Sequence, residues 1–144
     1  MNFPDVAALI PHSGTMCLLS EVVHHDNETI LCRATSHRSP TNPLRCDSRL
    51  PAVAGIEYAA QSAAAHCTLV TRNSGAGAPQ GVLAGARAVT LHAARLDDID
   101  APLTVRATRL VADGPRFLYE FAIEAGARKL LSGRIAVVLK EDGA

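Results

Sequence analysis

The stretch that decides the fold is LPAVAGIEYAAQSAAAHCTLVTR, residues 50–72. Its apolar residues recur at steps of three and four, which is the period of one face of a helix. The members of this stripe are Val53, Ile56, Ala60, Ala63, Cys67 and Val70. The other faces are mostly alanine, so neighbouring elements can approach the helix axis from every side. We therefore predict a buried central helix with Ser48 as its N-cap, Pro51 in its first turn and a stop after Arg72.

Four polar residues lie inside this apolar segment, namely Glu57, Tyr58, Gln61 and His66. A carboxylate in such a place costs free energy unless it is paired or hydrogen-bonded. Glu57 therefore has one of two roles. Either it accepts hydrogen bonds and orders the core, or it takes part in chemistry.

The composition indicates one compact domain spanning residues 1–144. The chain has 14 basic and 14 acidic residues, so its formal charge is zero and nothing suggests a nucleic-acid footprint or a basic membrane patch. The first residues lack a basic leader and a long apolar run, which predicts a cytoplasmic protein with no membrane span. The cysteines show no CxxC spacing, so we interpret them as small core residues. They are Cys17, Cys32, Cys46 and Cys67.

Around the helix, alternating apolar residues and turn signals predict a helical turn at residues 4–10 and six strands. The strands are expected at residues 16–23, 29–35, 81–91, 103–112, 117–124 and 129–140. Residues 36–49 contain Pro40 and Pro43 and are too irregular for a strand, and connections of this length often carry function. The layout predicts an α+β fold in which a curled antiparallel sheet wraps one long central helix.

Four stretches carry a resemblance to a known family. They are ALIPHSGTMCLLSEVV at 8–23, LPAVAGIEYAAQ at 50–61, and residues 84–102 and 117–139. In this order they resemble the 3-hydroxyacyl-carrier-protein dehydratases, which have the hot-dog fold. Within that family, PHSGTMCLL, NPLR and GIEYAAQ are most similar to the dehydratase-like subunits found with aryl-polyene biosynthesis.

The resemblance implies a reaction of fatty acid or polyene biosynthesis, the loss of water from a (3R)-hydroxyacyl thioester to give a 2-enoyl thioester. The substrate would enter a tunnel at a dimer interface on the phosphopantetheine arm of acyl carrier protein or coenzyme A, and no metal or other cofactor is required. A histidine removes the proton α to the carbonyl, and an acid on the helix protonates the departing hydroxyl. By motif, Glu57 matches the acid and Gln61 the family glutamine. The backbone N–H groups that polarise the thioester match Ala52, Val53, Ala54 and Gly55.

The match fails at the base. The family histidine lies fourteen residues before the acid, and that position is Pro43 in this chain. His37, six residues earlier in the same loop, is the candidate base within the chain, and a partner subunit is the alternative source. His12 matches a packing residue of the family. The other histidines lack spaced ligand partners, so we assign none to a metal; they are His24, His25, His66 and His92.

Three functions follow from the resemblance. The first is a dehydratase, with its base from His37 or from a partner. The second is a thioesterase in which Glu57 activates a water molecule that Gln61 positions. The third is a non-catalytic subunit that binds acyl chains or carrier protein and stabilises an active homologue. An open sheet edge predicts a homodimer or a heterodimer with a second hot-dog subunit. We expect the phosphate of the arm to be bound by Arg45, Arg49 and Arg87.

Overall fold

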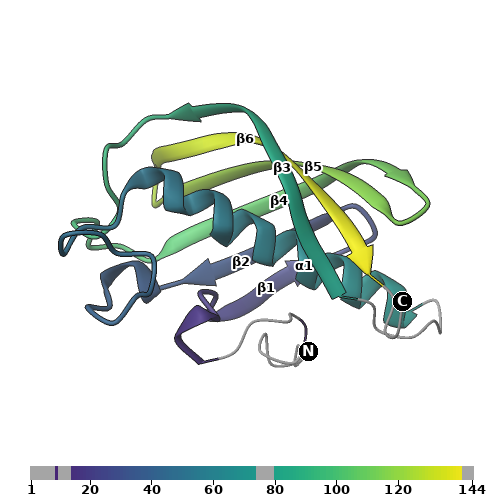
Figure 1. The fold of residues 1–144 in the computed structure, drawn as a ribbon, viewed down its shortest axis with the longest axis horizontal. Helices are drawn as coiled ribbons and strands as arrows, with labels where there is room; N and C mark the ends of the chain where they lie inside the picture. The colour runs from purple at the N-terminus through teal and green to yellow at the C-terminus, as the bar shows by residue number, and fades with distance from the viewer. Residues whose placement is uncertain (1–8, 10–13, 74–79, 141–144) are drawn as a thin grey trace.

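One long helix lies against a curled antiparallel sheet in the computed structural model, which describes residues 9, 14–73 and 80–140 (Figure 1). The helix is α1 (Gly55–Asn73). The strands are β1 (Glu21–His25), β2 (Thr29–Ala34), β3 (Gln80–Leu91), β4 (Leu103–Asp113), β5 (Arg116–Ala125) and β6 (Arg128–Lys140). The structure confirms the predicted α+β architecture.

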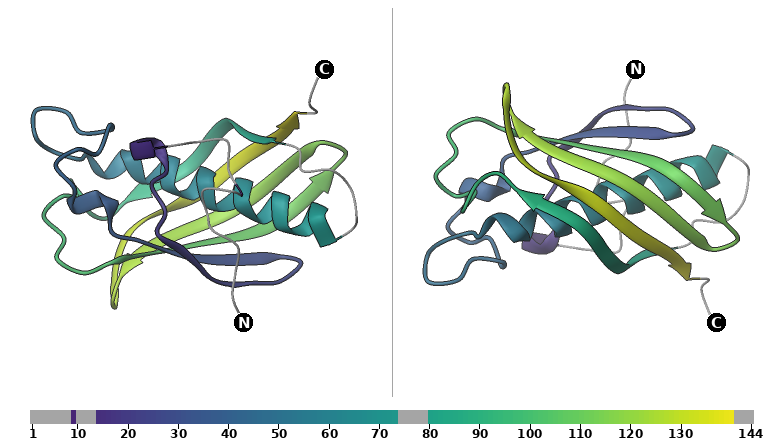
Figure 2. Two further views of the ribbon diagram at one scale, coloured as in Figure 1. Left: turned by 90° about the horizontal axis from the view of Figure 1, so that it is seen from below. Right: turned by 90° about the horizontal axis from the view of Figure 1, so that it is seen from above.

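The six strands form one sheet in the order β1-β2-β4-β5-β6-β3, and every neighbouring pair is antiparallel. β3 follows the helix in sequence but lies at the far edge of the sheet, beside β6. The two views in Figure 2 show the sheet bending around the helix. The edges of the sheet are therefore β1 and β3.

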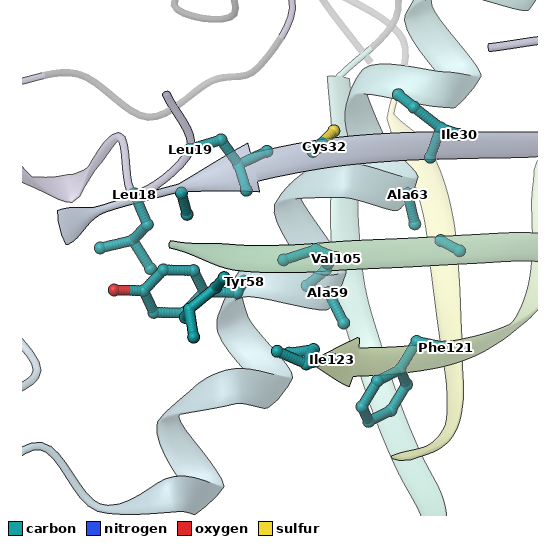
Figure 3. Packing of buried hydrophobic residues seen from close by; sticks show 14 of the residues in the cluster. Leu18, Leu19, Ile30, Cys32, Tyr58, Ala59, Ala63, Val105, Phe121 and Ile123 are labelled. Atoms are coloured by element: carbon teal, nitrogen blue, oxygen red, sulfur yellow. The ribbon is translucent and has the colours of Figure 1, made fainter. Parts of the chain in front are cut away.

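The helix is buried along its length, as predicted. Residues 58–69 are all buried, while residues 56, 57, 70 and 71 are only partly covered. Figure 3 shows Ala59 and Ala63 facing Val105 and Ile123 of the sheet, with Tyr58 next to Leu18. Small residues allow this close approach. A Cβ atom added to Gly55 would lie 2.7 Å from a methyl carbon of Leu131, so a larger residue where the helix begins would have to displace that side chain.

The prediction that Ser48 caps the helix is wrong. Ser48 has a φ of 65° in a tight turn from Cys46 to Arg49, and α1 is preceded by a 3₁₀ turn, η4 (Ala52–Ala54), with Pro51 as its N-cap. The cause is a tertiary contact. Leu50 O accepts from Leu96 N at 2.8 Å, and Ala52 N donates to Ala94 O at 3.0 Å. These bonds keep the backbone extended up to Pro51.

The first predicted strand begins too early. A 3₁₀ turn, η2 (Gly14–Met16), occupies its start, and β1 covers only Glu21–His25. Leu18 N donates to the Gln61 side chain rather than to a strand. The hairpin turn is tightened by Asp26, whose Oδ1 accepts from the N–H groups of Glu28 and Thr29.

The other predicted strands agree with the structure to within about one residue at each end. β3 shifts register between Leu83 and Gly85 and again between Arg87 and Thr90, so its glycine marks an irregularity of the strand. The predicted turn at residues 4–10 and His12 lie outside the described residues, except for Leu9, which is buried. No helix in the described part of the chain is long and apolar enough to cross a membrane.

Candidate active site

Glu57 lies in the first turn of α1 and is partly exposed. The sequence places Glu57 inside an apolar segment, where we expect a buried carboxylate, and the structure shows it only partly covered. Val53, one turn earlier, is 51% exposed, so the start of the helix is accessible there. A negative charge is also favoured at this end of a helix, where unpaired N–H groups concentrate. Glu57 is therefore a partly accessible carboxyl group at the N-terminal end of α1.

The backbone N–H groups predicted to polarise a thioester are largely engaged within the protein. Ala52 N donates to Ala94 O at 3.0 Å, and Ala54 N donates to Pro51 O at 3.0 Å. Gly55 N is directed at the carbonyls of Ala52 and Val53. These bonds occupy three of the four donors, and Val53 is the remaining one. The backbone of Val53 is thus the strongest candidate of the four for polarising a carbonyl.

Gln61 is buried, and both the oxygen and the nitrogen of its amide bond to the N-terminal segment. Its Oε1 accepts from Leu18 N at 2.9 Å, and its Nε2 donates to Met16 O at 2.6 Å. These two hydrogen bonds thus hold residues 16–18 against the helix. This contact gives Gln61 a structural role that the sequence did not reveal.

His37 lies in η3 (Ser36–Arg38) and is completely buried. Its Nε2 lies 3.1 Å from both the Ile99 and the Ala101 carbonyl oxygens, so Nε2 carries the proton and donates to both. Nδ1 is then unprotonated, and it has no partner among the described residues. Burial lowers the pKa of His37 and favours this neutral form. The ring is held to the turn that precedes β4.

The three arginines expected at a phosphate have different surroundings. Arg45 is committed to its own loop, because its guanidinium donates to Ser48 O at 3.0 Å and to His37 O at 3.3 Å. Arg49 is exposed at the end of the tight turn. Arg87 is exposed on edge strand β3, directly opposite Arg134 of β6. Arg45 and Arg49 thus belong to the loop before the helix, whereas Arg87 belongs to an edge strand.

Tyr58 forms a second polar feature at this end of the helix, which the sequence analysis noticed without assigning a role. Its hydroxyl lies 2.7 Å from Ser36 Oγ and accepts from Asn42 Nδ2 at 3.0 Å. The available signal was a tyrosine directly after Glu57 in an alanine-rich helix. Its partners come from the preceding loop, so no spacing rule would have identified them.

A third polar cluster is buried further along the helix. His66 Nδ1 lies 2.6 Å from the Tyr119 hydroxyl, which also contacts Cys67 Sγ and Arg109 Nη2, each at 3.2 Å. His66 Nε2 donates to Asp26 O at 2.8 Å, so Nδ1 must accept the Tyr119 proton. Burial lowers the pKa of His66 to about 4. The cluster joins the β1–β2 hairpin to α1, β4 and β5.

The cysteines and histidines show no metal-binding arrangement within the described residues, where no group of three or more potential ligands converges. All four cysteines are described and none forms a disulfide.

Comparison with known proteins gives the family. A family model, ApeP-like, described as "ApeP dehydratase", matches residues 4–144. Among solved structures, the chain resembles one in the dehydratase heterocomplex ApeI:P from Xenorhabdus doucetiae. The TM-score is 0.87 at 22% identity, covering 98% of this chain and 94% of that one. The comparison with curated proteins found no match.

Two thioesterases share the fold more distantly. A hypothetical thioesterase with coenzyme A from Streptococcus pneumoniae gives a TM-score of 0.60 at 11% identity, covering 83% of this chain and 84% of that one. A probable thioesterase from Bartonella henselae gives 0.55 at 15% identity, covering 80% and 92%. The family match over residues 4–144, together with the likeness to the heterocomplex structure, identifies the chain as a dehydratase-like hot-dog protein that belongs to the ApeP-like family.

Proposed function

We propose that this chain is one subunit of a (3R)-hydroxyacyl-thioester dehydratase in which Glu57 is the acid and a partner subunit supplies the base. The observation that carries this proposal is the state of His37. Its ring is completely buried and Nε2 is shared between two carbonyl oxygens, whereas Glu57 is partly exposed at the start of the helix. Pro43, which has no titratable side chain, stands where the sequence comparison expects the base.

In the proposed reaction the partner's base removes a proton from C2 of the acyl chain. The electron pair of that C–H bond forms the C2–C3 double bond, and the C3–O bond breaks. Glu57 donates its proton to the departing hydroxyl, which leaves as water. The base then loses its proton and Glu57 regains one, through solvent, before the next turnover. The Val53 N–H, at the positive end of α1, is the candidate donor to the thioester oxygen.

The sheet has an exposed edge strand at which a second chain could pair. β3 is an edge strand, and its residues 84–88 are exposed, so one side of its backbone is available to a second chain. The similar protein from Xenorhabdus doucetiae is a component of a heterocomplex, which supports a second hot-dog subunit here as well. We propose pairing along β3, with the catalytic site completed across the interface.

The proposed substrate is an acyl thioester on a phosphopantetheine arm, carried by acyl carrier protein or coenzyme A. Arg49 and Arg87 are exposed and available to a phosphate, whereas Arg45 is occupied by the carbonyls of His37 and Ser48. The aliphatic tail would be held by apolar side chains of the helix and sheet.

The test is a dehydration assay on this chain alone, on a hot-dog partner that co-purifies with it, and on the two together. We expect a 2-enoyl thioester only from the mixture, and no turnover when Glu57→Gln is introduced into a complex that still assembles. Folded His37→Asn should retain measurable turnover in the mixture, reduced only by the loss of the loop contacts to the Ile99 and Ala101 carbonyls. Dehydration by this chain alone that is lost in His37→Asn would overturn the assignment of the base. Release of free thiol in place of the enoyl product would identify a thioesterase.

A further inference from the structure

Tyr58 immediately follows Glu57, and its side chain is completely buried. Figure 3 shows its ring next to Leu18, with the hydroxyl directed away from Ile123 and Phe121. The hydroxyl is the middle of a chain of hydrogen bonds. Ser36 Oγ donates its only proton to Leu18 O at 2.7 Å, so the Tyr58 hydroxyl must donate to Ser36 Oγ. Asn42 Nδ2 in turn donates to the Tyr58 oxygen.

Every polar group of Asn42 is used in this arrangement. Its Nδ2 also donates to Ser36 O at 3.0 Å, and its Oδ1 accepts from Leu44 N at 2.9 Å. The orientation of the amide is therefore fixed by its neighbours. Through Asn42, the Tyr58 hydroxyl is coupled to the backbone on both sides of the bend in residues 36–45, which we call the 36–45 loop.

The other contacts of this loop lead to the segment before β4. His37 Nε2 is bonded to the Ile99 and Ala101 carbonyls, and Arg38 forms an ion pair with Asp100 at 3.2 Å. The loop is thus tied to the sheet side through His37 and Arg38 and to the helix through Tyr58. The views in Figure 2 place it beside the N-terminal end of α1, where Glu57 lies.

We propose that Tyr58 is a positioning residue of the reaction, which sets the 36–45 loop relative to the Glu57 carboxylate. This inference rests on the proposed function. Consecutive residues of a helix share one rigid backbone, so a loop fixed to the Tyr58 hydroxyl is also fixed relative to the backbone of Glu57. Misplacement of reacting groups by about 1 Å can lower a rate by about a hundredfold. Pro43, the position at which the resemblance expects the base, belongs to this loop, so loss of the Tyr58 hydroxyl should shift the loop beside the site and slow proton transfer from Glu57.

The test compares two tyrosine variants in the active assembly. Tyr58→Phe removes the hydroxyl that holds the loop and keeps the ring in the core. Tyr119→Phe is the control, because it removes another completely buried tyrosine hydroxyl, which lies on β5 and has three polar neighbours against two for Tyr58. We expect both to lower the melting temperature, whereas only Tyr58→Phe should lower kcat, by tenfold or more on the scale of positioning effects. KM should change less than kcat.

Asn42→Ala probes the same bond from the loop. If Tyr58 acts through Asn42, the protein that carries both Tyr58→Phe and Asn42→Ala should have a kcat no lower than that of the more impaired single variant. Asn42→Ala also tests the inference if Tyr58→Phe does not fold. Equal kcat for Tyr58→Phe, Tyr119→Phe and the parent would overturn it, as would an unchanged kcat for Asn42→Ala. If Glu57→Gln still turns over, the proposed function itself is wrong. If Glu57→Gln is inactive while Tyr58→Phe behaves like Tyr119→Phe, only the positioning role is wrong.

Discussion

The Nδ1 atom of His66 accepts a hydrogen bond from the Tyr119 hydroxyl across a distance of 2.6 Å, in a place where neither side chain reaches solvent. The acceptor exists only while the imidazole is neutral, because Nε2 already donates to Asp26 O. A protonated His66 would turn a second N–H towards Tyr119 and would face the positive charge of Arg109, which lies on the same hydroxyl.

This relationship predicts a loss of stability in acid. Burial lowers the pKa of His66 from 6.5 to about 4, so in the window between these values the unfolded chain binds a proton that the folded chain does not. The contribution of the neutral His66 to the free energy of unfolding is fully present above about pH 6.5 and falls as the pH drops towards 4. Its size is on the order of 3 kcal/mol across the window. Urea unfolding at several pH values measures it.

The control for this prediction is His66→Gln. It removes the titrating group, so its free energy of unfolding should fall less between pH 6.5 and 4 than that of the parent. Parallel curves for the two proteins would show that other groups cause the acid effect.

Gly55→Ala should destabilise the fold. The new methyl group would lie 2.7 and 2.8 Å from the two Leu131 methyl carbons and 3.1 Å from Ile123, and both of those side chains are buried. Overpacking of this kind costs about 1–3 kcal/mol, which exceeds the gain of up to about 1 kcal/mol from replacing glycine in a helix. Thermal unfolding measures the difference. Gly85→Ala is the matched control, because nothing lies within 4 Å of its added Cβ, and it should unfold close to the parent. A Gly55→Ala protein as stable as the parent would contradict the close packing.

Gln61→Glu tests the contact between the helix and the N-terminal segment. The substitution keeps the acceptor for Leu18 N but places a second oxygen where Nε2 donates to Met16 O. An unpaired buried acceptor costs about 1–3 kcal/mol and more when it is charged, so the variant should be less stable at neutral pH. Part of the loss should return in mild acid, because a protonated carboxyl can donate to Met16 O. Chemical denaturation at two pH values checks this, and Gln61→Leu, which cannot titrate, should show no such recovery.

The long helix and the antiparallel strands could be predicted because their patterns are local. Alanine on every face of residues 50–72 requires neighbours all round, and the alternation in 103–112 is that of a half-buried strand. The beginning of the helix was harder, since Leu50 and Ala52 bond to Leu96 and Ala94, about 45 residues away in the chain. Ser48 had the chemistry of an N-cap, but those contacts moved the cap to Pro51.

In the candidate site, too, local patterns could be predicted and contacts between distant residues could not. The position of Glu57 near the start of the helix followed from its motif, whereas the environments of His37 and Gln61 did not. His37 contacts carbonyls more than 60 residues later, and Gln61 contacts a segment more than 40 residues earlier. Such bonds leave no periodic trace in the sequence. The two polar side chains that appeared available for chemistry are in fact held by the backbone.

The tight turn before the helix also provides a place for a spectroscopic probe. Cys46 is exposed at its first position, whereas Cys32 and Cys67 are buried and Cys17 is partly covered. Burial raises the pKa of the Cys32 thiol to about 11 and also raises that of Cys67, which slows reaction with maleimide dyes. A fluorophore should therefore attach first at Cys46, close in sequence to Glu57. Its emission would then report the arrival of a carrier protein or a partner subunit in solution, without an engineered cysteine.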